Sequence, residues 1–269
     1  MSREERAPTW VIDAHIPSVA RMYDYYLGGK DNFAADRAAA EKVLAAMPYV
    51  RAFTRENRAL LCRVVTLLAQ RGIRQFLDLG SGLPTQENVH EVAQRAAPDS
   101  HVVYVDNDPI VLTHARALLA KDPFTTVIQA DLRDPASILE HPAFRAQIDL
   151  SRPVAVLLFA ILHFIRDDKE AAAIVAGLRE RLVPGSYLAV SHGYAGKISK
   201  EVEARVRGAY SATAAGDLIP RTPEQIQDYF DGTELLEPGI VPVEAWRPEH
   251  DVKLDMDKGG FLAAVGRVR

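Results

Sequence analysis

The chain has 269 residues, of which 48% are hydrophobic and 25% charged, and these ordinary globular values exclude a disordered chain, a coiled coil and a collagen-like fibre. The net charge is −4 and no basic run occurs, which disfavours nucleic acid as the main partner. The sequence has no apolar run of about 18 residues, no apolar signal region after its charged start, and one cysteine, Cys62. We therefore expect a cytoplasmic protein without a membrane span, a disulfide or a zinc site.

The first 72 residues have the spacing of amphipathic helices. Val43, Leu44 and Met47, and later Leu60 and Leu61, belong to apolar sets that recur every three or four positions. These sets predict an N-terminal helical cap over residues 1–72. The segment 23–33 interrupts the pattern, because it mixes tyrosine, glycine and amide residues without a clear period.

Beyond residue 72 the sequence alternates between short apolar strands and helices. We expect strands over 75–79, 102–105, 126–129, 154–159 and 187–191, nearly all apolar as in parallel sheets covered on both faces. Asp108 and Asp134 each precede a proline and predict helix starts, and Thr222 opens a capping box. Two final strands, 239–243 and 260–268, leave no room for a crossover helix and predict an antiparallel pair.

This order predicts an α/β fold over residues 73–269, with a doubly wound, mostly parallel sheet of seven strands. Ligands of such sheets bind at the carboxyl ends of the strands, so the residues that follow each strand are the candidate site. After the first strand comes Asp78-Leu-Gly-Ser-Gly82, a turn whose glycines allow close backbone approach to a ligand. Taken alone, glycines at such a position are required only for the geometry of the turn about as often as they are required for a ligand.

The second and third strands each end beside an acidic residue. Asp106 lies about 20 to 25 positions past the glycines, where a carboxylate can accept hydrogen bonds from ribose hydroxyls. Asp131 lies where a carboxylate can accept a bond from the amine of adenine, although either acid is also compatible with a solvated loop. Together the three strand ends predict an adenosine ligand. The third glycine of the dinucleotide fingerprint is absent, since Thr85 occupies its position, and this disfavours NAD or FAD.

The segment Asp78–Gly82 resembles the first motif of the class I S-adenosylmethionine-dependent methyltransferases, and Asp106 and Asp131 match the second and third acidic positions of that class. The whole chain is similar to a bacterial methyltransferase family formerly catalogued as a domain of unknown function. The segments 17–33, 82–90 and 222–248 carry this similarity, and the first of them is long and unusual.

The resemblance implies that S-adenosylmethionine is the cofactor and assigns parts of its binding site. It places the amino-acid end of the cofactor at the glycine turn, where Asp78 either orients the turn or meets the ammonium group through water. It places the ribose at the second strand, the adenine at the third and the methionine side at the fourth. The residues concerned are Gly80, Ser81 and Gly82, then Asp106 and Asn107, then Asp131 and Leu132, and finally Phe159 and Ala160.

His163 follows the fourth strand and is the candidate general base. Its imidazole could deprotonate an acceptor near neutral pH, whereas the alternative is a packed histidine bonded to the backbone. The motif that many nucleic-acid amino-methyltransferases carry after this strand is absent, which again disfavours DNA and RNA. We see no set of metal ligands.

The segment 23–33 has two interpretations. It is either a lid, with Tyr23, Gly29 and Asn32 contacting the ligand and Arg58 pairing with a carboxylate, or a structural turn. The function we expect is methyl transfer to a small-molecule acceptor. The alternatives are a protein that binds S-adenosylmethionine or S-adenosylhomocysteine without transferase activity, and a nicotinamide-dependent oxidoreductase. The sequence identifies no dimer interface and leaves the oligomeric state open.

Overall fold

A computed structural model describes residues 13–84, 87–119 and 122–269. Its strands are β1 (Gln75–Leu79), β2 (His101–Asp106), β3 (Thr125–Gln129), β4 (Ala155–Phe159), β5 (Tyr187–Tyr194), β6 (Thr233–Leu235), β7 (Val241–Pro242) and β8 (Gly260–Val268). Its α-helices are α1 (Val19–Leu27), α2 (Ala34–Ala46), α3 (Val50–Gln70), α4 (Val89–Ala96), α5 (Pro109–Leu119), α6 (Pro135–Glu140), α7 (Pro142–Gln147), α8 (Asp168–Arg179), α9 (Lys200–Tyr210) and α10 (Pro223–Gln227). Position 85, where the dinucleotide fingerprint has its third glycine, lies outside the described residues.

The strands form one sheet in the order β3-β2-β1-β4-β5-β8-β6, and the two-residue β7 also pairs with β8. Neighbours among β1 to β5 run parallel, and β8 is antiparallel to β5, β6 and β7. The predicted doubly wound, mostly parallel sheet is therefore confirmed, and so is the antiparallel pairing of its last two expected strands. The sequence analysis missed β6, whose three residues are too short to show a period.

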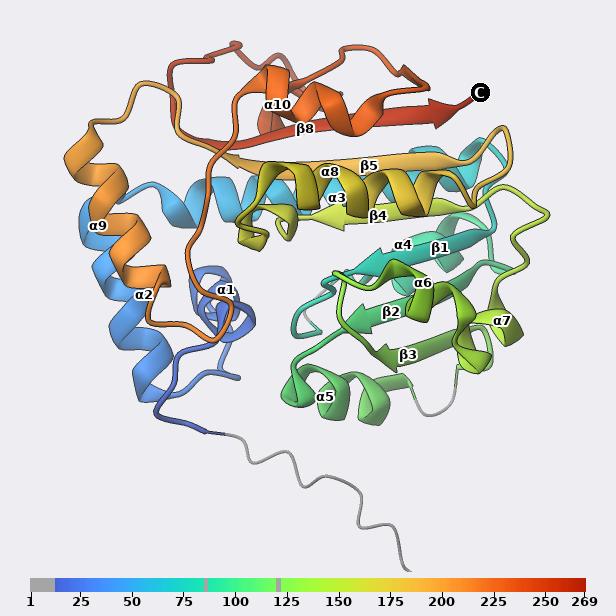
Figure 1. The fold of residues 1–269 in the computed structure, drawn as a ribbon, viewed down its shortest axis with the longest axis horizontal. Helices are drawn as coiled ribbons and strands as arrows, with labels where there is room; N and C mark the ends of the chain where they lie inside the picture. The colour runs from blue at the N-terminus through green and yellow to red at the C-terminus, as the bar shows by residue number, and fades with distance from the viewer. Residues whose placement is uncertain (1–12, 85–86, 120–121) are drawn as a thin grey trace, which may run out of the picture.

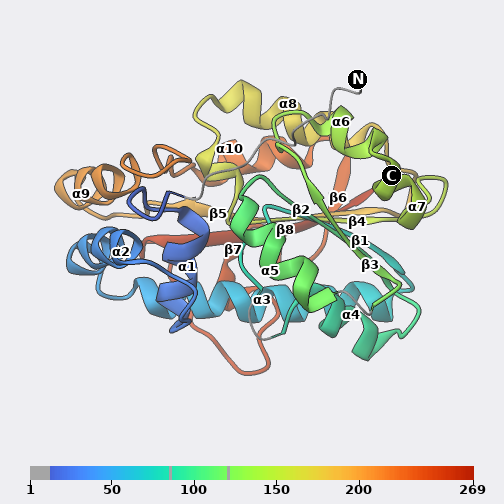
Figure 2. The ribbon, with the colours of Figure 1, turned by 90° about the horizontal axis from the view of Figure 1, so that it is seen from below.

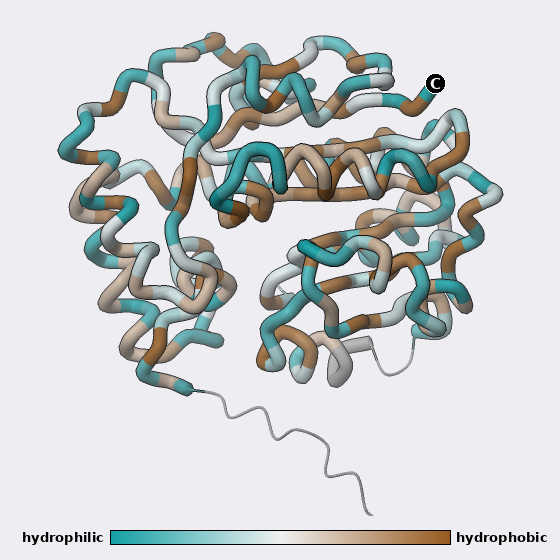
Figure 3. The backbone as a smooth tube through the Cα atoms, viewed as in Figure 1, coloured by the Kyte–Doolittle hydropathy of each residue, from teal (hydrophilic) through white to brown (hydrophobic). Residues whose placement is uncertain are grey.

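Helices cover both faces of the sheet because the strands are apolar on both. Leu60 and Leu68 of α3 and Val92 of α4 pack on one face, while Ile138 of α6 and Val175 of α8 pack on the other. Figure 2 shows α3 and α4 on one side of the sheet and α6, α8 and α10 on the opposite side. The hydrophobic residues concentrate along central strands such as β4 and β5 (Figure 3).

Helices α1, α2 and α9 form a group of their own beyond the carboxyl ends of the parallel strands (Figure 1). Met22 and Tyr26 of α1, Val43 of α2, and Val206 and Tyr210 of α9 share one apolar cluster. Helix α9 lies between β5 and β6 in the sequence, so the second half of the chain contributes to the cap. The division of the chain at residue 72 stays a prediction.

The predicted helix starts agree with the structure. Helices α5 and α6 begin at the prolines that follow Asp108 and Asp134, and the Asp134 carboxylate accepts a bond from the Ser137 N–H. Thr222 forms the expected capping box with Gln225 at the start of α10. The N-cap residue Asp108 matters for the site, because its own carboxylate is held two residues after the end of β2.

Candidate functional site

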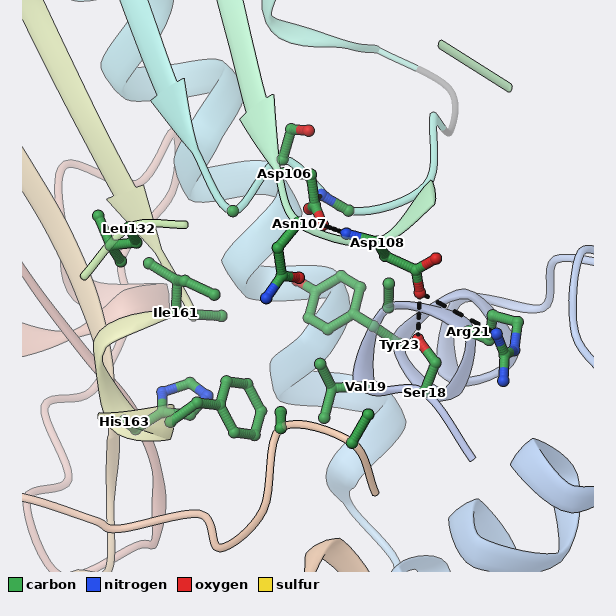
Figure 4. Close-up of a pocket in the computed structure, with 18 of the residues that line it drawn as sticks. Ser18, Val19, Arg21, Tyr23, Asp106, Asn107, Asp108, Leu132, Ile161 and His163 are labelled. Atoms are coloured by element: carbon green, nitrogen blue, oxygen red, sulfur yellow. Dashed lines mark hydrogen bonds and ion pairs between the residues drawn. The ribbon is translucent and has the colours of Figure 1, made fainter. Parts of the chain in front are cut away.

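A cavity of about 800 Å³ lies at the carboxyl ends of the strands, between the sheet and the helical cap. This size falls within the range of about 300–1,000 Å³ that is usual for small-molecule sites. It is lined by the ends of β1, β2 and β4, by one side of α1, by part of α3 and by the segment 214–218. Figure 4 shows Tyr23 of α1 and Asn107 after β2 projecting into the same space.

The glycine turn after β1 brings backbone to the cavity. Gly80 has φ +73°, and a Cβ built there would lie 2.5 Å from Cγ1 of Ile161. Its N–H donates to the Val105 carbonyl at 2.8 Å, which ties the turn to β2. Gly82 has φ +65°, a conformation that side chains rarely adopt. Gly80, Ser81 and Gly82 all line the cavity, and their contact with the cofactor stays a prediction.

Asp106 lies at the end of β2 and is 9% exposed. Its Oδ2 accepts a hydrogen bond from the Gly82 N–H at 2.9 Å, and its Oδ1 accepts one from the Asp108 N–H at 2.9 Å. Burial raises the pKa of Asp106 to about 6 against the opposing effect of these bonds. Each carboxylate oxygen has a second lone pair, so Asp106 is able to accept further bonds from a ligand.

Asp78, on β1, lines the same cavity and is 5% exposed. Burial raises the pKa of its carboxyl to about 7, the positive charge of Arg58 lowers it, and the negative charge of Asp106 raises it further. Two carboxyls that share one cavity favour a ligand with a cationic group, because a cation stabilises their charged forms.

The predicted cofactor contacts that follow β2 and β3 and those that end β4 also line the cavity, with different surroundings. Asn107 is exposed to it, and Leu132 lies on its wall (Figure 4). Asp131 accepts hydrogen bonds from the Arg133 guanidinium at 2.6 to 3.1 Å, which occupies both of its oxygens. Phe159 and Ala160 end β4, and Ala160 has φ 53° with its N–H held by the Ser191 carbonyl at 3.0 Å. Such a positive φ in a non-glycine residue is uncommon and occurs often at functional sites.

Tyr23 of α1 reaches α3 through a hydrogen-bonded set. Its hydroxyl donates to the Thr54 carbonyl at 3.3 Å and accepts from Nδ2 of Asn57 at 2.9 Å. Asn57 is 3% exposed, lines the cavity, and its Oδ1 has no hydrogen-bond partner within the described part of the chain. A buried amide oxygen without a donor is costly, so this atom is a ready acceptor for a ligand.

Asn57 was missed by the sequence analysis, which singled out Arg58 and the apolar residues of α3 but not the polar residues on its buried face. The available signal was polarity on the buried face: Thr54 and Asn57 occupy buried positions of a helix in which Leu60, Leu61 and Val64 are also buried. Arg58, the predicted carboxylate partner, lines the cavity and donates to the Glu87 carbonyl at 3.0 Å.

Gly29 and Asn32 are not among the residues that line the cavity; they surround Asp24, which does line it. Nδ2 of Asn32 donates to Oδ2 of Asp24 at 2.8 Å, and the Asp31 N–H donates to the same oxygen at 3.0 Å. A Cβ at Gly29 would overlap the Asp24 carboxylate. The expected contact of Gly29 and Asn32 with the ligand stays a prediction. In the structure both residues help to hold the Asp24 carboxylate in place.

Helix α1 is joined to the sheet at its first turn. The Ser18 hydroxyl donates to Oδ2 of Asp108 at 2.9 Å, and the Arg21 guanidinium lies 4.0 Å from the same oxygen (Figure 4). Arg21 also forms a buried ion pair with Asp36 of α2 at 2.7 Å. The cap thus meets the start of α5 next to the acid at the end of β2.

His163 lies in the 3-10 turn Leu162–Phe164 after β4, lines the cavity and is 2% exposed. Its Nδ1 accepts a hydrogen bond from the Gly193 N–H at 3.1 Å. Burial lowers the pKa of His163 well below its usual range, and the neighbouring His192 and Arg221 lower it further. The sequence analysis named His163 as the candidate general base, and that role stays a prediction.

The strand order, the glycine turn and the acid at the end of β2 define a class I S-adenosylmethionine-dependent methyltransferase. The model of the S-adenosyl methyltransferase family matches residues 5–269, and the chain belongs to that family. The protein is therefore an enzyme whose cofactor is S-adenosylmethionine.

Two crystal structures resemble the chain along nearly its full length. A Thermobifida fusca YX protein described as a methyltransferase is 45% identical, with a TM-score of 0.89 over 96% of this chain and 97% of its own. A DUF574 family protein from Streptomyces avermitilis is also 45% identical, with a TM-score of 0.90 over 96% of this chain and 100% of its own. No curated protein matches the sequence.

Within 13–84, 87–119 and 122–269, no helix is long and apolar enough to cross a membrane. The same part of the chain has no group of three or more His, Cys, Asp or Glu residues that could hold a metal ion.

Proposed function

We propose that this enzyme transfers the methyl group of S-adenosylmethionine to a small, largely apolar molecule that enters beside His163. The observation that carries the proposal is the single cavity region that Asp106, Asn57 and His163 share. When bound, the cofactor supplies an activated methyl group, so the chain mainly has to align the acceptor and exclude water.

The residues of the cavity fit the cofactor. The unpartnered Oδ1 of Asn57 and the Asp78 carboxyl offer acceptors for its ammonium group, and Arg58 offers a cation for its carboxylate. Asp106 retains lone pairs for two ribose hydroxyls. The strained Ala160 and the turn that follows it carry His163 toward the acceptor side.

The acceptor side is apolar. Phe164, Tyr210, Leu218 and Phe261 line the cavity near His163, whose ring packs edge-on to Phe164 and stacks with Phe261. Apolar and aromatic walls with few polar groups are typical of sites for small organic molecules rather than for a charged polymer. This wall supports a small-molecule acceptor, in keeping with the acidic net charge of the chain.

Calorimetric titration with S-adenosylmethionine, S-adenosylhomocysteine and NAD tests the cofactor site. We expect the first two to bind and NAD not to bind. Transfer of labelled methyl groups from S-adenosylmethionine to fractions of small metabolites then tests the reaction. Binding without transfer to any fraction would favour the alternative, a protein that binds the cofactor without transferase activity, and binding of NAD alone would contradict the proposal.

A further inference from the structure

The turn that carries His163 is clamped by a buried arginine from a distant segment. Arg221 lies after β5 and before α10, and it is 2% exposed. Its Nη1 donates to the Leu162 carbonyl at 3.0 Å and its Nη2 to the Ile165 carbonyl at 2.9 Å, so it holds both sides of the turn. The Ile219 N–H donates to the carbonyl of His163 itself at 2.8 Å.

Arg221 also fixes the proton on a second histidine. Its Nη1 lies 2.9 Å from Nε2 of His192, and because a guanidinium only donates, that nitrogen must accept. The ring proton of His192 is therefore on Nδ1, which lies 2.9 Å from the Gly193 carbonyl, a group that only accepts. Asp168 accepts a bond from Nε of Arg221 at 2.9 Å and compensates the buried charge.

The same reasoning fixes the tautomer of His163. The Gly193 N–H is only a donor, so Nδ1 of His163 carries the lone pair and the ring proton lies on Nε2. The groups packed against the ring are Phe164, Phe261 and His192, with the Arg221 charge close by. No carboxylate of the described residues bonds to this imidazole, and the nearby arginine opposes a second positive charge.

We propose that Arg221 and His192 are positioning residues that hold His163 as a neutral imidazole whose Nε2–H faces the cavity. His163 then donates a hydrogen bond to the methyl acceptor and does not take its proton. This inference rests on the proposed function and replaces the general base of the sequence analysis with a donor. It also names a class of acceptor: an apolar, aromatic molecule with a hydrogen-bond-accepting atom at or beside the methylated atom.

The acceptor of such a site attacks with a lone pair that is already available at neutral pH. A new bond forms from that lone pair to the methyl carbon, and the bond from carbon to sulfur breaks with its electron pair kept by sulfur. A proton that the acceptor still carries leaves to water rather than to His163. A carboxylate oxygen or a weakly basic aromatic nitrogen meets this condition, whereas an aliphatic amine, which is protonated at neutral pH, and an unionised hydroxyl do not.

Nitrogen-15 spectra of the imidazole rings test the inference directly. Protein labelled at histidine and saturated with S-adenosylhomocysteine is followed between about pH 5 and pH 8, the range in which ordinary histidines titrate. The signals of His163 are identified by their loss in His163→Phe. We expect an unprotonated Nδ1, a protonated Nε2 and no titration. A His163 that titrates in this range, or that carries its proton on Nδ1, would overturn the inference.

A second variant tests the part of Arg221. In Arg221→Met the charge and the bond to His192 are lost, and we expect the pKa of both histidines to rise and His192 to lose its fixed proton position, because Nε2 of His192 no longer has to accept a bond. The matched control, Arg166→Met, removes an exposed arginine that pairs with Asp217 at the cavity mouth and leaves both histidines unchanged. Should Arg221→Met fail to fold, the wild-type spectra still decide the tautomer. Unaltered histidines in a folded Arg221→Met protein would contradict the positioning role, and failure of S-adenosylhomocysteine to bind would instead count against the proposed function.

Discussion

Asp106 ends β2 with one backbone N–H on each carboxylate oxygen, so its geometry is fixed before any ligand arrives. For Asp106→Ala we expect the affinity for S-adenosylhomocysteine to fall by about 10- to 100-fold, because hydrogen bonds to a charged group contribute about 1.5–3 kcal/mol. Calorimetry measures the change. Asp99→Ala is the matched control, since Asp99 forms an exposed ion pair with Arg74 away from the cavity. Unchanged affinity in Asp106→Ala would rule out the ribose assignment.

We predict that Asp78 makes the binding of the cofactor depend on pH. Burial raises the pKa of Asp78 to about 7 and that of Asp106 to about 6, and we expect both acids to contact the ligand in their charged forms. Affinity for S-adenosylhomocysteine should therefore rise with pH up to about 7 and then level off, by about tenfold per pH unit for one linked proton. Titrations at several pH values in wild type and in Asp78→Asn measure this, and the variant should bind more weakly with a flatter profile. Affinity that is constant or falls with rising pH contradicts the role of Asp78.

The site residues that could be predicted from the sequence are those that come at the end of a predicted strand. Gly80, Gly82 and Asp106 come at the ends of apolar segments, and the topology of a parallel sheet then brings them together. Asn57 was not predictable in the same way. It stands out because its buried Oδ1 has no hydrogen-bond partner in the described part of the chain, and only the packing around it shows this. The proton on His163 depends on Gly193, 30 residues along the chain, which no local pattern reveals.

Among the elements, the turn between β1 and α4 depends on glycine for two reasons. Gly80 has a positive φ, which costs a residue with a side chain about 1–2 kcal/mol, and its missing Cβ leaves room for Ile161. We expect Gly80→Ala to lower both the unfolding temperature and the affinity for S-adenosylhomocysteine. In the double variant Gly80→Ala with Ile161→Ala the contact is relieved and the φ strain is not, so the affinity should recover in part. Complete recovery, or no loss in the single variant, would contradict this account.

The elements also show where periodicity fails. Apolar runs located β1, β2, β4 and β5 because each of these strands is buried along nearly its whole length. Strand β6 has an exposed Glu234 at its centre and pairs only at the sheet edge with β8, so no apolar run marks it. Helix α9 was not assigned to the cap, because its partners α1 and α2 lie far from it in sequence and hydrophobic spacing identifies a buried face without naming what covers it.

For the whole molecule, the cavity lies between the sheet and the helical cap, which aromatic as well as polar contacts hold together. The sheet supplies Asp78 and Asp106, the cap supplies Tyr23, and the Ser18–Asp108 hydrogen bond connects the two across the cavity rim. A ligand that contacts both sides should stabilise both together. At 100 times its dissociation constant, S-adenosylhomocysteine should add about 2.7 kcal/mol to the free energy of unfolding, which for a chain of this size raises the unfolding temperature by about 5–10 °C.

Amide hydrogen exchange distinguishes this closure from binding to the sheet alone. If the cap is a lid, S-adenosylhomocysteine should slow exchange in α1 (Val19–Leu27) as well as in the turn at 80–82, because Tyr23 and the Asn57 amide then contact the ligand together. Ser18→Ala removes the link to Asp108, and we expect faster exchange in α1 without ligand and a smaller ligand-induced protection, since one hydrogen bond contributes about 1 kcal/mol. Helix α7 (Pro142–Gln147), which lies away from the cavity lining, is the internal reference. Protection confined to the strand ends, with α1 unaffected by ligand in wild type, would identify the cap as a static structural element and leave the cofactor site to the sheet.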